Sequence, residues 1–467
     1  MYRKKFLLLL SITAFMVRSG AQQQPPPFKK ISDEQLVQHV DALVSQATQM
    51  GLFSGIIVVA KNGSPVYERI EGYRDWEAKL PITPATHFNI GSINKFFTDE
   101  LVHQLILEKK VQLQDPVQKH FTLFGNRLDQ QITIAQLMEH RSGLGDYFSS
   151  ADFRQAEDPA ALTLQNQLNT IRKMPLVFEP GKGSRYSNSG YIVLGAIIEA
   201  ATGKSFDQNL KERILEPLQL NNTFYTQADQ QRVELARPTY LHVDGRKQNW
   251  HGNGILAPSP AGSMLSTTKD LITLAEAARG GKLPSGRKYL LENQAGGTEA
   301  LNAIMAILPE GISVIILANM GFIADEISDR IAALYLGHPS RPLRYPLEME
   351  LFNNYKKEGA GYFEKNLQFI TQELMQKTFD VKKRRPEDER MLQFLANRFK
   401  ASNRPDIALE LLQLNAKLFE EKANVHFALA EAQLGAGERE AARSNYRRTL
   451  LINPSHEGAK KKLAQLE

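Results

Sequence analysis

Two pairs of strand-like runs, each separated by a turn signal, lie far apart in the N-terminal two thirds of the chain. A strand-length run on either side of a tight turn predicts a β-hairpin. Asn62-Gly63 provides the first turn signal, and Pro309-Glu310-Gly311 provides the second. The strands of the predicted hairpins are residues 55–60 and 65–70, and residues 303–308 and 312–318.

Helical periodicity occupies the rest of this region. An amphipathic run over residues 32–50 begins at the N-cap signal Ser32-Asp33-Glu34, and another run covers residues 323–336. Residues 91–280 have a mostly helical pattern that glycine and proline interrupt. Strands at both ends with helices between them predict an α+β domain over residues 32–338. We expect the two hairpins to pair into one antiparallel sheet, flanked by helices and accompanied by an all-helical part.

Beyond residue 338 the pattern is helical only. Residues 339–388 are charged and helix-favouring, and we interpret them as a helical linker. They include the basic cluster Lys382-Lys383-Arg384-Arg385. A cluster of this size is more typical of a solvated linker face than of a nucleic-acid site, so we expect no nucleic-acid partner.

The last segment, residues 389–467, repeats itself with a period of 34 residues. Ala442 and Tyr446 correspond to Ala408 and Leu412 one period earlier. Paired helices with this period, with small residues where the helices cross, resemble the tetratricopeptide repeat. An α-helical repeat domain of this kind predicts a groove for a protein partner. A purely stabilising extension is the open alternative.

The first 21 residues have the features of a secretory signal peptide. A basic start is followed by a short apolar run, Phe6–Val17, and by small residues that end at Ala21. A membrane anchor is the alternative, but a span needs about 20 apolar residues. Removing this segment takes away four cations and no acid, so the net charge of +6 becomes +2. We therefore expect a periplasmic or secreted protein without a membrane span after leader removal.

Composition excludes several chemistries. The 467 residues include no cysteine, which rules out disulfides, thiolate zinc sites, iron–sulfur clusters and a cysteine nucleophile. Hydrophobic residues make up 42% and charged residues 23%, as in a globular protein. The histidines are scattered, and no glycine-rich phosphate loop precedes a helix. We expect neither a metal nor any other cofactor.

A serine and a lysine three residues apart suggest nucleophilic chemistry. Ser92 follows Gly91 at the start of a helical stretch, so its hydroxyl and the Lys95 amine face the same side. A serine hydroxyl is a weak nucleophile until a base removes its proton. A serine at a helix N-terminus also places backbone N–H groups near a developing oxyanion. Alone, this pair is weak evidence for a catalytic site, because an ordinary helix N-cap has the same pattern.

A second element, Tyr186-Ser187-Asn188, strengthens this interpretation. In an extended loop the two outer side chains point the same way. A phenol can act as general base, and a carboxamide can bind a substrate carbonyl. The segment 132–144 before it predicts a helix ending at Gly143, and the segment 260–271 after it predicts another helix start.

The order of these elements resembles the serine β-lactamase and penicillin-binding-protein family. The branch is that of class C β-lactamases, D-Ala-D-Ala carboxypeptidases and related esterases, and the resemblance covers residues 32–338. The resemblance implies that Ser92 is the acylated nucleophile. It implies that Lys95 and Tyr186 share proton transfer and that Asn188 positions the substrate amide or ester. The motifs are Ser92-x-x-Lys95, His140-x-Ser142-Gly143-Leu144 and Tyr186-x-Asn188.

One family element departs from the expected pattern. The family has Lys or His on the strand that enters the second hairpin, and the matching stretch here has Gln294. Gly297 can still donate a backbone N–H to an oxyanion, because that needs no side chain. Gln294 supplies no positive charge to a substrate carboxylate. The segment 283–293 is also short, and His251-Gly252-Asn253-Gly254 stands in the wrong order to replace the cation.

Two functions are consistent with these residues. The first is an exported serine hydrolase that forms an acyl-enzyme with a small ester or amide, including one derived from the cell wall. Without a cation at position 294, we expect little activity on β-lactams and D-Ala-D-Ala peptides. The alternative is a catalytically weakened homologue that binds a cell-wall fragment or a protein. The intact Ser92, Lys95, Tyr186 and Asn188 set favours the enzyme.

Overall fold

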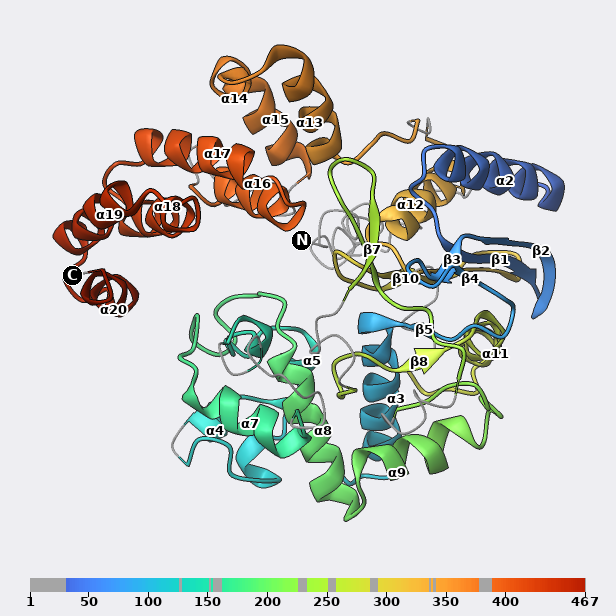
Figure 1. Ribbon diagram of the computed structural model, residues 1–467. Coiled ribbons are helices and arrows are strands. Elements are labelled where there is room, and N and C mark those ends of the chain that lie inside the picture. The colour runs from blue at the N-terminus through green and yellow to red at the C-terminus, as the bar shows by residue number, and fades with distance from the viewer. Residues whose placement is uncertain are drawn as a thin grey trace. The chain divides into compact units, whose positions relative to one another are not determined.

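The computed structural model contains two compact units (Figure 1). One is a sheet-containing unit, made of the described residues up to 240 and of 248–343. The other is a helical unit, made of residues 241–247 and the described residues from 344 onward. The described residues are 31–125, 128–150, 153, 162–225, 233–250, 258–285, 293–335, 337–338, 342–377 and 389–466.

Five antiparallel strands form the sheet. Their order is β2 (Ser64–Glu71), β1 (Gly55–Lys61), β11 (Ile312–Ala318), β10 (Asn302–Ile307) and β9 (Asn293–Gly297). Both predicted hairpins are confirmed, and so is their pairing through β1 and β11. The N-terminal and C-terminal hairpins therefore close one sheet, as the sequence pattern predicted.

Helices cover both faces of this sheet. α2 (Asp33–Gln49) packs on α12 (Ile323–Tyr335), which contacts β10 and β11, whereas α11 (Thr268–Arg279) packs on β1, β10 and β11. Every residue of β11 is buried, as expected for a central strand covered on both sides. α2 begins where the sequence predicted. Ser32 accepts from the Gln35 N–H, and the Gln35 side chain accepts from Ser32 N–H in a capping box.

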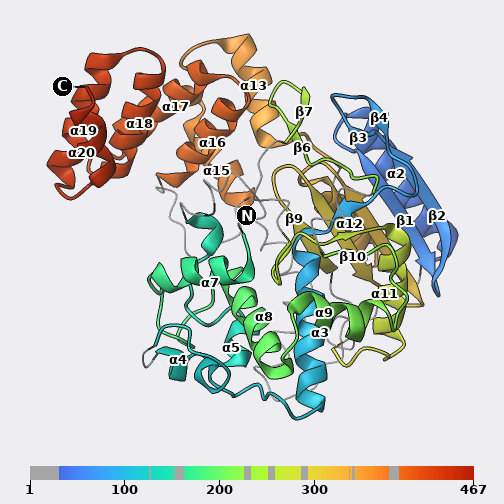
Figure 2. The ribbon, with the colours of Figure 1, turned by 60° about the horizontal axis from the view of Figure 1, so that its bottom comes forward.

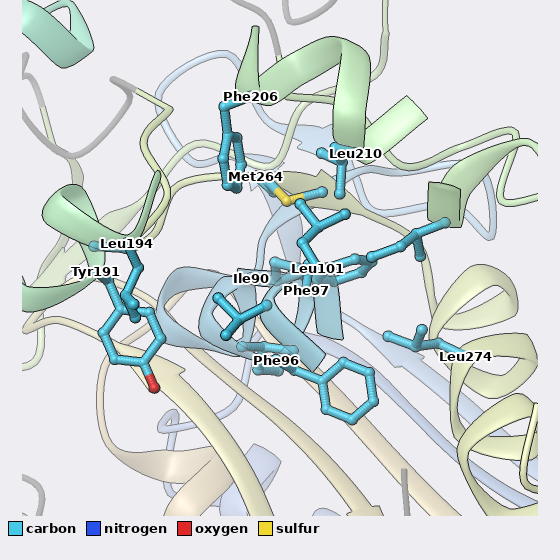
Figure 3. Close-up of a cluster of buried hydrophobic side chains, with 14 of the residues drawn as sticks. Ile90, Phe96, Phe97, Leu101, Tyr191, Leu194, Phe206, Leu210, Met264 and Leu274 are labelled. Atoms are coloured by element: carbon cyan, nitrogen blue, oxygen red, sulfur yellow. The ribbon is translucent and has the colours of Figure 1, made fainter. Parts of the chain in front are cut away.

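A cluster of helices beside the sheet surrounds α3 (Asn94–Leu107), as Figure 2 shows. α3 is buried from Asn94 through Val102, on all sides rather than along one stripe, which is typical of a central helix. Phe96, Phe97 and Leu101 lie in one apolar core with Tyr191 and Leu194 of α8 (Figure 3). The other helices of the cluster are α4 (Leu128–Gln131), α5 (Ile134–Met138), α7 (Leu164–Lys173), α8 (Ser189–Thr202) and α9 (Phe206–Leu210).

The helix predicted over residues 132–144 is shorter than expected. α5 ends at Met138, and His140 adopts a left-handed conformation with φ of 56°. Tertiary contacts determine this end, because the His140 carbonyl accepts from the Arg185 N–H instead of continuing the helix. Gly143 is not a helix cap. A Cβ there would lie 2.1 Å from the Phe178 carbonyl oxygen, so glycine allows two backbone segments to approach.

The helix start predicted within residues 260–271 is confirmed, and it lies near the end of that segment, at Thr268. Leu265–Ser266 forms the short strand β8, which pairs with β5 (Phe88–Asn89). α11 begins only at Thr268, after Thr267 caps it by accepting from the Asp270 N–H. The remaining short elements of this unit and of its boundary are β3 (Tyr73–Asp75), β4 (Leu80–Pro81), β6 (Thr239–Leu241), β7 (Lys247–Asn249), η1 (Gly91–Ile93), η2 (Val117–Lys119), η3 (Tyr147–Ser149) and η5 (Lys211–Leu215).

The helical unit has its own apolar core. α17 and α19 begin 34 residues apart, and Ala408, Leu412, Ala442 and Tyr446 are all buried. Residues 241–247 belong to this unit. Its helices are α13 (Leu347–Glu358), α14 (Tyr362–Lys365), α15 (Leu367–Lys377), α16 (Arg390–Ala401), α17 (Pro405–Leu418), α18 (Ala423–Gly435), α19 (Arg439–Ile452) and α20 (Glu457–Ala464).

Several predictions concern segments outside the described residues. These are the signal peptide, the basic cluster at 382–385, the segment 251–254 and most of 283–293. Within the ranges that the structure describes, no helix is long and apolar enough to cross a membrane.

Candidate active site

Ser92 lies on a tight turn that joins a strand to a helix. β5 runs into the 3₁₀ turn η1, which holds Ser92, and α3 follows directly with Lys95 in its first turn. The Asn89 side-chain oxygen accepts from the Gly91 N–H at 2.8 Å, and Gly91 has φ of 51°. The turn is therefore fixed from within, in a conformation that favours glycine.

Four of the six residues singled out from the sequence form one hydrogen-bonded cluster. The Ser92 Oγ lies 2.7 Å from the Tyr186 hydroxyl and accepts from Lys95 Nζ at 3.0 Å. Lys95 Nζ also donates to Asn188 Oδ1 at 2.8 Å and to the Ala261 carbonyl oxygen. Nucleophile, amine, phenol and carboxamide are therefore within hydrogen-bonding reach of one another.

Burial differs among the four side chains. Lys95 and Asn188 are only 7% and 6% exposed, whereas Ser92 and Tyr186 are partly exposed. A buried amine needs compensation. Lys95 obtains it from its three acceptors and from the Tyr186 and Tyr191 rings, whose centroids lie 5.0 and 5.3 Å from Nζ. The reactive oxygens can therefore meet a substrate while the amine behind them stays fixed.

The Tyr186–Asn188 segment is held by the loop after α5. The His140 ring packs on the Tyr186 ring with centroids 4.5 Å apart, and its Nδ1 lies 3.3 Å from the Ser187 N–H. Asn188 has φ of −69° and ψ of −27° and directly precedes α8, without a side-chain hydrogen bond to the helix end. It is thus helical rather than part of the extended loop that the sequence suggested. The two side chains nevertheless reach the same cluster, because the Tyr186 hydroxyl contacts Ser92 Oγ and Asn188 Oδ1 accepts from Lys95 Nζ.

β9 passes directly beside the nucleophile. A Cβ added at Gly296 would lie 2.1 Å from the Ile90 carbonyl oxygen and 2.5 Å from the Ser92 N, and one added at Gly91 would lie 2.8 Å from the Gly297 N. Only glycine permits this approach. The backbone around Gly297 therefore lies beside that of Ser92, as an oxyanion hole built from two backbone N–H groups requires.

Gln294 lies on the same strand, opposite Met305 of β10, and is half-buried. Residues two apart on a strand face the same side, so Gln294 projects on the face that Gly296 turns toward the Ser92 backbone. Position 294, where the family has a Lys or His, thus lies on the face of β9 that borders the nucleophile. Here that position carries a neutral carboxamide.

Asp146 is part of the site although the sequence reasoning did not include it. Its carboxylate oxygens accept from Asn188 Nδ2 at 3.2 and 3.1 Å, and Oδ1 accepts from the Phe148 N–H at 3.2 Å. Burial raises the pKa of Asp146, against the opposing effects of the Phe148 N–H, the Asn188 amide and the Lys95 charge. In the sequence Asp146 has only the signal of a turn cap.

No metal constellation accompanies these groups. Across the described part of the chain, no set of three or more His, Asp or Glu side chains is placed to hold a metal ion. The groups that are present can activate a hydroxyl, move a proton and stabilise an oxyanion.

Comparison with known proteins gives concordant matches. A family model described as Beta-lactamase matches residues 39–312. A teichoic acid D-alanine hydrolase of Staphylococcus aureus is 34% identical over 182 residues, which cover 39% of this chain and 43% of that protein. The match therefore spans less than half the length of these curated relatives.

Solved structures share the fold. A penicillin-binding protein homologue from Pyrococcus abyssi, described as octameric, has a TM-score of 0.56 at 24% identity and covers 68% of this chain and 81% of its own. A D-amino acid amidase from Ochrobactrum anthropi has a TM-score of 0.55 at 21% identity, and the match covers 65% of this chain and 99% of the amidase chain. FmtA from Staphylococcus aureus has a TM-score of 0.54 at 23% identity, and the match covers 72% of this chain and 99% of the FmtA chain. At these identities the likeness concerns the fold alone.

Proposed function

The chain belongs to the β-lactamase family, and on this premise we propose that it is a serine hydrolase that forms an acyl-enzyme at Ser92. The observation that carries the proposal is the pair of short contacts from Ser92 Oγ, 2.7 Å to the Tyr186 hydroxyl and 3.0 Å to Lys95 Nζ. These contacts place a phenol and an amine, two groups that can take up the serine proton in their basic forms, within reach of Ser92, which a mere helix cap does not need.

The reaction proceeds in two halves. The Ser92 oxygen attacks the acyl carbon while its proton passes to Lys95 or Tyr186. The backbone N–H groups of Ser92 and Gly297 stabilise the oxyanion, and Asn188 positions the acyl group. The group that took the Ser92 proton returns it to the leaving alcohol or amine, and water then cleaves the acyl-enzyme by the reverse path.

The substrate class follows from the charges of the site and from the relatives. A neutral Gln294 offers no ion pair to a terminal carboxylate, so we infer a small ester or amide without one at that end. The names of the matched proteins, a teichoic acid D-alanine hydrolase and a D-amino acid amidase, make aminoacyl esters and amides of the cell envelope the first substrates to test. The signal-peptide features agree with such an exported role.

Replacing Tyr186 by Phe tests the phenol. The ring and its packing on His140 remain, but the oxygen 2.7 Å from Ser92 is lost. We expect hydrolysis of a short-chain p-nitrophenyl ester to fall about 100-fold, the order of a lost general acid–base group. Thermal unfolding should stay near that of the wild type. A wild-type rate in this variant would show that Tyr186 takes no part in proton transfer.

Replacing Gln294 by His tests the missing cation. At pH 6, where an ordinary imidazole is largely charged, the variant should hydrolyse a D-alanyl ester with a terminal carboxylate about tenfold faster than wild type does, the value of one charge-assisted hydrogen bond. The matching ester with a terminal amide should change little. Gln294→Met is the uncharged control. An equal change on both esters would show that position 294 does not face the substrate carboxylate.

A further inference from the structure

The Asn188 side chain lies between an anion and a cation. A carboxamide has one accepting and one donating end of nearly the same shape, so its neighbours decide its orientation. The Asp146 carboxylate only accepts, and both of its oxygens lie near Asn188 Nδ2, at 3.2 and 3.1 Å. The NH₂ end must therefore face Asp146, which leaves Oδ1 facing Lys95 Nζ at 2.8 Å.

This orientation determines which bonding position of Lys95 Nζ is left for Ser92. The Ala261 carbonyl oxygen can only accept, and the Asn188 Oδ1 can only accept as well. Together they take two hydrogens from Nζ. A charged amine has a third hydrogen and a neutral amine has a lone pair in its place. In either state, that remaining position points to Ser92 Oγ, 3.0 Å away.

We infer that Asp146 is a positioning residue, which locks the Asn188 amide and thereby aims the Lys95 nitrogen at Ser92. The inference rests on the proposed hydrolase function. If the amide flipped, its NH₂ would face a charged amine as one donor against another. Against a neutral amine, the flipped NH₂ would occupy the lone pair that Ser92 needs. Asp146 prevents both outcomes without touching the substrate.

Asp146 is itself held in place. It caps the 3₁₀ turn η3, where its Oδ1 accepts from the Phe148 N–H. The groups that face its carboxylate are the side-chain amide and the backbone N–H of Asn188, just before α8, this Phe148 N–H and, at longer range, the Lys95 charge from α3. Burial raises the pKa of Asp146, so protonation begins at a higher pH than for an exposed aspartate. Protonation makes the carboxyl a donor and releases the constraint.

Asp146→Asn is the direct test. Its oxygen can still cap Phe148 and lie near Asn188 Nδ2, as Asp146 Oδ1 does at 3.2 Å. The second oxygen, Oδ2 at 3.1 Å from Asn188 Nδ2, is replaced by an NH₂ that opposes the Asn188 NH₂ and weakens the lock. We expect kcat on a p-nitrophenyl ester to fall tenfold to about a hundredfold, because the base is misaligned. The loss should be larger in kcat than in KM, since Asp146 acts on the substrate only through Asn188.

Ser149→Ala is the matched control, because Ser149 is exposed on the same turn and donates to the Asp146 carbonyl rather than to Asn188. It should keep the wild-type kcat. Asp146→Ser is the alternative variant if the Asn variant does not fold. It retains a hydroxyl to cap Phe148 and should show the same loss of kcat.

The pH profile separates positioning from a structural role. In wild type, protonation of Asp146 should contribute to the acidic limb of kcat/KM, and that contribution should vanish in Asp146→Asn. A kcat within twofold of wild type, or an unchanged acidic limb, would overturn the inference. Labelling of wild type by a fluorophosphonate would show in that case that the hydrolase proposal still stands.

Discussion

Ser92→Ala should reduce ester hydrolysis by a factor on the order of 10⁴ to 10⁶, the cost of removing a nucleophile or its partner from a serine hydrolase. The hydroxyl is the only group of Ser92 that contacts both Tyr186 and Lys95. Its loss leaves the backbone N–H groups and the binding residues in place. The measurement is the steady-state rate on a p-nitrophenyl ester, with thermal unfolding as the check on the fold.

Ser64→Ala is the control for this variant, because Ser64 is an exposed serine at the start of β2. It should hydrolyse the ester at the wild-type rate. If Ser92→Ala retained more than about a tenth of the wild-type activity, Ser92 would not be the nucleophile, and the contacts around it would need another explanation.

Gly296→Ala should inactivate the protein through backbone geometry. The added methyl group would lie 2.1 Å from the Ile90 carbonyl oxygen and 2.5 Å from the Ser92 N, so β9 has to move away from the nucleophile turn. Losing one oxyanion donor costs about 10²- to 10³-fold in rate. Since the turn that holds Ser92 is displaced as well, we expect a loss of about 10³-fold. Overpacking should also lower the free energy of unfolding by about 1–3 kcal/mol.

Gly435→Ala gives the matched control. Gly435 is the last residue of α18, and a Cβ there meets no atom within 4 Å. We expect an unchanged rate and a gain in stability of up to about 1 kcal/mol, because alanine favours a helix over glycine. Near-wild-type hydrolysis by Gly296→Ala would show that β9 does not form the oxyanion hole.

The parts of the fold that could be predicted are those with local signals. The Asn62-Gly63 turn between two strand-like runs located the first hairpin, and the N-cap signal at Ser32 located α2. The position of the two hairpins at the ends of one α+β domain predicted that they pair, and they do so through β1 and β11. In each case, neighbouring residues carried enough information to define the element.

Elements that depend on distant contacts were missed. β5 and β8 have two residues each and exist because the chain segments meet, so no periodicity can indicate them. α5 stops early because the His140 carbonyl pairs with the Arg185 N–H, which is remote in sequence. A pattern of apolar positions does not contain such pairings.

The residues of the candidate site also fall into those that the sequence could predict and one that it could not. Ser92, Lys95, Tyr186 and Asn188 were found because their spacing resembles a family motif, and the structure brings them together. Asp146 was not found, because one aspartate before an aromatic pair looks like a turn cap. Its second role depends on Asn188, 42 residues later in the chain.

Covalent labelling by a fluorophosphonate tests the central claim most directly. The reagent reacts with an activated serine and reports the nucleophile whatever the natural substrate is. Intact-mass and peptide mapping of the wild-type protein should show one adduct, on the peptide that contains Ser92, and Ser92→Ala should show none. A folded wild-type protein that takes up no label at Ser92, or a Ser92→Ala variant that labels equally, would contradict the assignment of Ser92 as an activated nucleophile.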